Sequence, residues 1–240
     1  MASIVEITAY TAAAGACIPI GGLLAKIEHI HPTWMEREFR HFVIAFGGGV
    51  LLAAVALVLL PDGIKYVREP VVVLLYFFAG GLLFFRLERI LGLRRRESPQ
   101  FIATLLDYVP ESLALGGVFA AGAPTAPLLA VLIGIQNLPE GFNAYRELMS
   151  IKGTQSRRIL ILMGLLIPIG PILAICGWIF LSRYTHLLGA VMLIASGGIL
   201  YLIFQDIAPQ SRLKNHWLPP LGAVSGFGMG LLGLLLIGGR

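Results

Sequence analysis

Residues 104–117, TLLDYVPESLALGG, place a proline and two acidic residues inside a run that is long and apolar enough to cross a membrane. Residues 133–145, IGIQNLPEGFNAY, repeat the Pro-Glu step. A carboxylate is costly to hold at membrane depth, and a proline removes a backbone hydrogen bond from a helix. Because both costs occur twice, these two stretches are the first candidates for a functional site.

The rest of the chain is strongly apolar. Of its 240 residues 57% are hydrophobic and 13% are charged, whereas about a quarter of the residues in soluble domains are charged. A transmembrane helix needs roughly 20 apolar residues, and eight windows meet this condition: 7–26, 41–62, 70–90, 100–121, 127–149, 158–181, 186–208 and 218–238. The sequence therefore predicts an all-α polytopic membrane protein with eight transmembrane helices, forming a single transmembrane domain over residues 1–240.

The basic residues predict the orientation of these helices. The loops and span ends on one side hold 14 of the 18 Lys and Arg residues, and the other side holds only Lys65, Arg68, Arg183 and Arg240. Because cytoplasmic loops carry the excess of Lys and Arg, both termini are expected outside. The same asymmetry accounts for the net charge of +5, so no nucleic-acid partner is expected. An inner or plasma membrane is the simplest location.

The two Pro-Glu stretches align as one unit used twice. Superimposing the Pro-Glu steps matches three pairs of residues: Asp107 with Gln136, Tyr108 with Asn137, and Glu111 with Glu140. Internal repeats of this kind are common in transporters, whose sites lie between the repeats. Pro110 and Pro139 are expected to kink their helices and to free the carbonyls of Leu106 and Ile135.

Helical spacing brings the polar side chains of each unit onto one face. Asp107 and Glu111 are four residues apart, as are Gln136 and Glu140, so the members of each pair are neighbours on a helix surface. No Lys or Arg lies in the middle of these helices to balance the charge. The missing charge could be a metal ion, a proton on one carboxylate, or both. The candidate metal ligands are Asp107, Glu111, Gln136, Asn137, Glu140 and Asn143.

Oxygen donors without His or Cys favour harder ions such as Mn²⁺, Fe²⁺ or Mg²⁺. The amides alone would be interpreted as hydrogen bonds between helices. Asp62 and Asp206 lie near span ends, where a helix cap or contact with water is the commoner role. His29 and His31, beside Glu28, form a weaker second candidate.

This pattern resembles the ZIP (Zrt- and Irt-like) family of divalent metal transporters. The resemblance spans essentially the whole chain and rests on DYVPES, QNLPEG, FGGGVLLAAVALVLLPD and ASGGILYLIFQDIAP. It implies a ZIP-like helix bundle with a metal site between helices four and five. In this implied site Asp107, Glu111, Gln136 and Glu140 fall on a primary metal position, and Asn137 with the two glutamates falls on a secondary one.

Four positions depart from the family pattern. Asp107 stands where His is usual, Tyr108 where Asn is usual and Ser112 where Gly is typical; Ile167 precedes Pro168 where an acidic residue is frequent. An aliphatic side chain cannot bind a cation, so one main metal is favoured. Three carboxylates close together also predict that metal binding releases protons and weakens at low pH.

The expected function is transmembrane transport of divalent transition-metal cations, of the Zn, Fe, Mn or Cd class, toward the cytoplasm. The metal would be the transported substrate, with no prosthetic group, and the chain is not expected to be an enzyme. The bilayer and a second copy of the chain, in a homodimer, are the other expected partners. The alternatives are a diverged, non-transporting metal sensor or scaffold, an intramembrane hydrolase, and a proton or anion channel.

Overall fold

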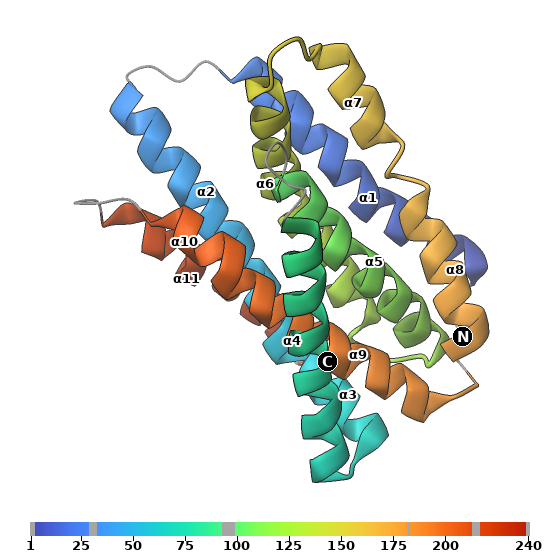
Figure 1. Cartoon of the computed structure of the whole chain (residues 1–240). Helices are drawn as coiled ribbons and strands as arrows, with labels where there is room; N and C mark the ends of the chain where they lie inside the picture. Colours follow the sequence, from blue (N-terminus) through green and yellow to red (C-terminus); the bar gives the residue numbers. More distant parts are fainter. Residues whose placement is uncertain (1–2, 29–32, 93–98, 182, 213–216, 239–240) are drawn as a thin grey trace.

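The computed structural model describes residues 3–28, 33–92, 99–181, 183–212 and 217–238, and this part of the chain is helical with no strand. Figure 1 shows the long helices packed as a bundle. The helices are α1 (Ile4–Ile27), α2 (Thr33–Ala54), α3 (Leu60–Val67), α4 (Pro70–Gly92), α5 (Pro99–Ala120), α6 (Ala126–Ser150), α7 (Ser156–Gly164), α8 (Ile169–Leu181), α9 (Thr185–Leu202), α10 (Ala208–Ser211) and α11 (Leu218–Gly238). Two π-helical segments, η1 (Val55–Leu59) and η2 (Ile203–Ile207), join α2 to α3 and α9 to α10.

The predicted spans correspond to helices, and seven helical segments are long and apolar enough to cross a membrane. The eighth predicted span is α6, which has 25 residues but is not among those seven. It is too polar because it carries Gln136, Asn137, Glu140 and Asn143. The architecture is that of a multi-pass membrane protein, and its least apolar long helix is the one that bears most of the candidate ligands.

The second and seventh spans share an interruption. In each, one π-helical turn precedes a proline, Pro61 after η1 and Pro209 after η2. A proline cannot donate to the carbonyl four residues earlier, and a wider turn is one way for a helix to accommodate that loss. These two spans therefore reach further than predicted, from Glu38 to Val67 and from Thr185 to Ser211.

The sixth span, predicted as one helix over 158–181, is divided in two. Between α7 and α8 the backbone makes short-range bonds, from Leu166 N to Met163 O and from Ile167 N to Gly164 O. Pro168 and Pro171 follow, and neither can donate a helical hydrogen bond. Ile167 therefore lies in a turn, where the irregular backbone is covered by α1: a Cβ added at Gly15 would lie 3.2 Å from the Ile167 carbonyl oxygen.

Glycines hold the long helices together in four pairs. A Cβ added at Gly141 or Gly21 would meet the backbone of α1 or α6 respectively, so these two helices touch backbone to backbone. The same close approach occurs in the other three pairs, α2 with α11, α4 with α9, and α5 with α8, through Gly49, Gly222, Gly226, Gly80, Gly197, Gly116 and Gly177. Small residues permit such contacts in lipid, where no hydrophobic force drives helices together.

The four pairs follow a regular rule. Counted as spans, the pairs are one with five, two with eight, three with seven, and four with six. If span one is exchanged with six, two with seven, three with eight and four with five, each of these pairs becomes another of the four. The exchange also matches the two spans that contain π-helical turns. It places α5 opposite α6, which agrees with the internal repeat inferred from the Pro-Glu stretches.

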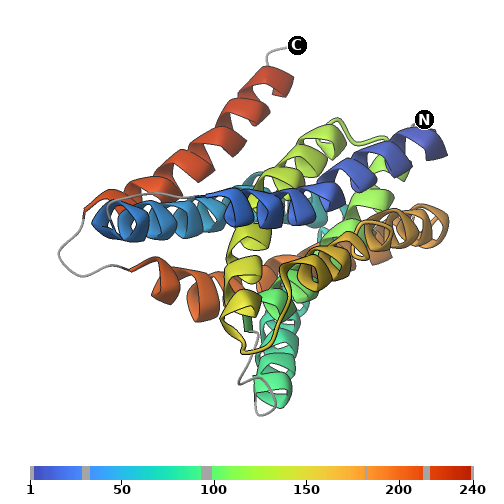
Figure 2. The same cartoon turned by 90° about the horizontal axis from the view of Figure 1, so that it is seen from above.

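The outside of the bundle is apolar, and the polar side chains of α5 and α6 lie within its largely hydrophobic interior. Phe78 is 62% exposed on α4 and Leu235 is 64% exposed on α11, whereas Glu111, Gln136 and Asn137 are all 0% exposed. Figure 2 shows α4 and α11 at opposite edges of the bundle. In both views the start of α1 and the end of α11 lie toward the same end of the bundle (Figures 1 and 2). This arrangement suits a protein whose surroundings are hydrocarbon rather than water.

Candidate metal centre

Helices α5 and α6 carry the six candidate ligands into the interior. Asp107 and Glu111 lie on α5, and Gln136, Asn137, Glu140 and Asn143 lie on α6. All six side chains are buried. Both helices continue through Pro110 and Pro139 as α-helix, so the spacing expected from the sequence is preserved across each proline.

The three carboxyl groups are close enough to influence one another. Asp107 interacts electrostatically with Glu140, Glu111 with Asp107, and Glu140 with Glu111. One direct hydrogen bond also joins the two helices, from Gln136 Nε2 to Glu111 Oε2 at 2.8 Å. Residues 25 positions apart in the chain therefore meet, and the pairing of α5 with α6 that the alignment predicts is present.

Most of the other side-chain oxygens of this cluster have no hydrogen-bond partner. Seven buried side-chain oxygens of this cluster accept no hydrogen bond: Asp107 Oδ1, Glu111 Oε1, Gln136 Oε1, Asn137 Oδ1, Glu140 Oε1, Glu140 Oε2 and Asn143 Oδ1. Buried polar atoms are nearly always hydrogen-bonded, so each exception requires an explanation. All seven are acceptors, which is the arrangement that a cation satisfies and that a further carboxylate or carbonyl does not.

Among the side chains that the structure describes, none supplies the missing positive charge. Within the described residues, neither Lys nor Arg forms an ion pair with Asp107, Glu111 or Glu140. The carboxylates nevertheless do not converge fully, because the described residues contain no group of three or more His, Cys, Asp and Glu side chains placed to hold a metal ion. Any ion held here would thus depend on the amide oxygens or on a further approach of α5 to α6.

Asn137 and Tyr108, which the repeat aligns with each other, both face α1. Asn137 Nδ2 donates to the carbonyl oxygen of Ala14 at 2.9 Å. The Tyr108 ring is buried, and its hydroxyl fills the space that side chains at Gly15 and Gly170 would otherwise occupy. The amide of Asn137 thus acts as the interhelical contact considered above as the alternative to a ligand, while its oxygen stays without a partner.

Asn143 borders a polar cavity of about 340 Å³. Arg40 from α2, Gln210 from α10, and Arg146, Glu147 and Ser150 from α6 line the rest of it. Asn143 lies three residues beyond Glu140, on the side that the distribution of basic residues assigns to the cytoplasm. Beside the cavity, Arg146 forms an ion pair with Glu28, which ties the ends of α6 and α1 together.

Two residues of this region were not expected from the sequence. Thr104 is buried on α5, near the Glu140 carboxyl group. Its position three residues before Asp107, and hence on the same helical face, is the signal that could have identified it. Thr125 donates a 2.6 Å hydrogen bond to Asp62 Oδ2, while Lys65 binds Asp62 Oδ1 at 2.7 Å.

Asp62 is therefore a buried structural group that links α3 to the start of α6. This differs from the expected cap or water-facing acid, because the chain folds the turn before α6 over the carboxylate. His29 and His31 of the second candidate group lie outside the described residues. Both cysteines, Cys17 and Cys176, are free and partly buried inside predicted spans.

No model of a known protein family matches the chain, and no curated protein matches it. The functional interpretation accordingly depends on the geometry of α5 and α6.

Proposed function

We propose that this protein transports divalent metal cations across a membrane, with the passage of each ion centred on Glu111 and Glu140 and completed by Asp107 and Gln136. The observation that carries the proposal is the set of seven unpartnered acceptor oxygens in the interior of a bundle that is apolar outside. Burying charge without compensation is unfavourable, and a divalent ion compensates two carboxylates at once.

The chemistry of the donors supports harder ions of the transported class. The cluster offers carboxylate and amide oxygens, and neither His nor Cys occurs among the six candidate residues. Mn²⁺ and Fe²⁺ accept such ligands more readily than thiolate-preferring ions do. The resemblance to ZIP transporters, with movement toward the cytoplasm, is part of this proposal. The polar cavity beside Asn143 would then be the exit.

A second candidate function is metal sensing or scaffolding without transport. It is favoured by Ile167, an aliphatic residue at a position where the ZIP family often has an acidic ligand. It is also favoured by the absence, among the described residues, of three carboxylates already placed around one point. A binding site without a second access route would have the same ligands and no flux.

The test is uptake of Mn²⁺, Fe²⁺, Zn²⁺ and Cd²⁺ into proteoliposomes by the native protein and by the variants Glu111→Gln and Glu140→Gln. Glu69→Gln is the matched control, because Glu69 is exposed in the turn between α3 and α4. Transport predicts flux that both site variants abolish and the control keeps. Glu140-dependent binding without flux of any metal would instead support the sensor or scaffold, and flux unaffected by both variants would refute the proposed site.

A further inference from the structure

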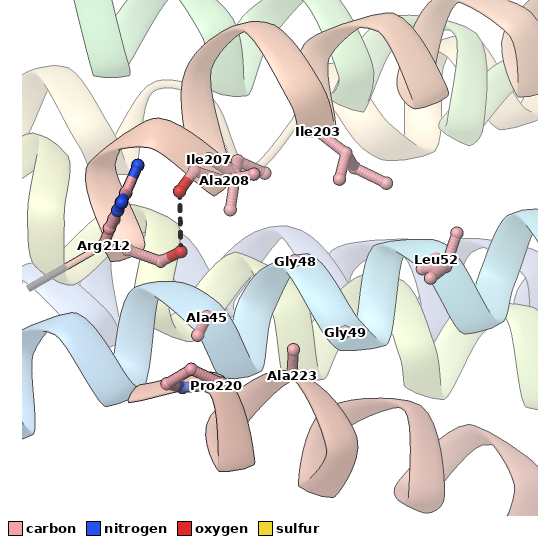
Figure 3. Close-up of a pocket in the computed structure, with 11 residues that line it drawn as sticks. Ala45, Gly48, Gly49, Leu52, Ile203, Ile207, Ala208, Arg212, Pro220 and Ala223 are labelled. Carbon is pink, nitrogen blue, oxygen red and sulfur yellow. Dashed lines mark hydrogen bonds between the residues drawn. The ribbon is translucent and has the colours of Figure 1, made fainter. Parts of the chain in front are cut away.

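A cavity of about 390 Å³ separates α2 from the end of the seventh span. Figure 3 shows α2 on one side, Ile203, Ile207 and Ala208 facing it, and Pro220 and Ala223 of α11 below. The lining is apolar except for Ser211 and Arg212. The cavity reaches the outer surface of the bundle, because Leu52, which lines it, is 37% exposed.

The cavity owes its shape to the glycines of α2. Gly48 and Gly49 present no side chain, which lets Ile207 and Ala223 pack directly against α2: a Cβ at Gly48 would lie 2.8 Å from Ile207 Cγ2. These contacts with η2 and α11 bound the cavity, and α2 leaves no side chain in it at either position. Protein interiors are packed without gaps of this size, and an apolar cavity does not retain water. In a bilayer, the material available to fill an apolar space that opens at the surface is a lipid acyl chain.

The polar end of the cavity carries a positive charge. Ser211 Oγ donates to the Ala208 carbonyl at 2.9 Å, the dashed line in Figure 3, so the hydroxyl already has an acceptor. Arg212 is exposed, and it makes no hydrogen bond or ion pair with any residue that the structure describes. It lies at the end of the seventh span, on the side that holds 14 of the 18 basic residues.

That side is the cytoplasmic one by the distribution of Lys and Arg, and the cytoplasmic leaflet is the one that displays anionic phospholipids. We propose that an anionic phospholipid of the bilayer binds in this cavity, with one acyl chain in the apolar space bounded by α2, η2 and α11 and its phosphate on Arg212. The apolar walls match the chain, and the exposed guanidinium matches the phosphate.

Helix α2 would connect the bound lipid with the candidate metal centre. Gly47 precedes Gly48, and a Cβ at Gly47 would lie 3.0 Å from Pro139 Cγ, the residue before Glu140. Three consecutive glycines of α2 thus face three different helical segments: α6, η2 and α11. A chain seated in the cavity would fix the position of α2 against Pro139, whatever passes through the bundle.

The experiment measures lipid retention. The full chain is purified in detergent with equal amounts of phosphatidylglycerol and phosphatidylcholine, and the bound lipids are counted by native mass spectrometry. Two variants test the two ends of the site: Arg212→Gln removes the charge, and Ala208→Phe fills the cavity from an exposed position. Arg158→Gln is the matched control, because it removes an equally exposed arginine from the expected cytoplasmic end of α7.

The native protein and Arg158→Gln should retain phosphatidylglycerol preferentially, and Arg212→Gln should lower its retention about fivefold, as expected for one basic residue near an anionic surface. Ala208→Phe should lower the retention of this lipid at least as much. Equal losses in Arg212→Gln and Arg158→Gln would indicate diffuse charge attraction and overturn the site. Unchanged retention in an Ala208→Phe variant that elutes as a native-size particle would overturn the placement of the acyl chain.

Discussion

The two Pro-Glu helices resemble each other in sequence but occupy different places in the bundle. On α6, 17 of 25 residues are buried, and Pro139 packs against Gly47. On α5, Val109 is 41% exposed beside a half-buried Pro110. Exposed apolar residues occur on α6 as well, since Val131 is 49% exposed. Polarity is tolerated on α6 because its four polar candidate ligands all lie on the buried part of the helix.

The charges are also divided unequally. α5 brings two carboxylates, Asp107 and Glu111, whereas α6 brings one carboxylate and the amides of Gln136, Asn137 and Asn143. Gln136 then stabilises one of the α5 carboxylates by donating a hydrogen bond to Glu111. Two copies of one unit have therefore become an acidic half and an amide half.

The largest expected effect concerns pH. Protons and metal compete for the same carboxylates, so affinity should rise with pH and fall as pH is lowered, by up to about tenfold per pH unit where one proton is displaced. Asp107→Asn makes α5 match the amide at the equivalent position of α6, and it should give a shallower slope between about pH 5 and 8. Calorimetric titration with Mn²⁺ measures both slopes, and identical slopes would contradict the acidic-half interpretation.

The next effect concerns packing beside the motif. Gly141 follows Glu140 and faces the backbone of Ile18, whereas Ser112 holds the equivalent place on α5. Gly141→Ala should destabilise the protein by about 1–3 kcal/mol, the usual result of overpacking. The midpoint of unfolding in mixed micelles is the measurement.

Gly228→Ala on α11 is its control, because a Cβ there meets nothing within 4 Å. The two variants gain the same methyl group, so helix propensity cancels between them. Equal stability of both variants would show that the contact between α1 and α6 is looser than described.

A smaller effect is expected from the amide that joins the halves. Gln136→Ala removes the donor to Glu111 and one acceptor oxygen. We expect metal affinity to fall about tenfold, the low end for loss of a group that orients metal ligands. Gln136→Glu should restore much of the affinity while steepening the pH dependence. No change in affinity with either variant would exclude Gln136 from the site.

The smallest effect separates the two residues that face α1. Asn137→Ala loses the hydrogen bond to Ala14, which should cost about 1 kcal/mol. Tyr108→Phe should be neutral or slightly stabilising, because it removes a buried hydroxyl that has no hydrogen-bond partner. Unfolding midpoints compare the two variants, and a larger loss in Tyr108→Phe would reverse the assignment of the two roles.

The sequence allowed the helical architecture and the polar face of α5 and α6 to be predicted, because apolar length and four-residue spacing are local properties. It did not reveal the π-helical turns before Pro61 and Pro209, since a proline predicts strain but not how the backbone relieves it. The hydrogen bond from Thr125 to Asp62 joins residues 63 positions apart, and no local pattern contains such a pairing. Metal transport itself stays a prediction.

The polarity of α6 has a consequence for how the protein is made. Helices enter the membrane from the translocon according to their apolarity, and each polar residue near the centre of a helix lowers the probability of insertion. α6 is a long helix that is not apolar enough to be counted among the membrane-crossing segments. It nevertheless packs on α1 through Gly21, Gly141 and the hydrogen bond from Asn137 to Ala14. α1 is synthesised before α6, so during biosynthesis it can serve as the docking partner that α6 needs to leave the translocon.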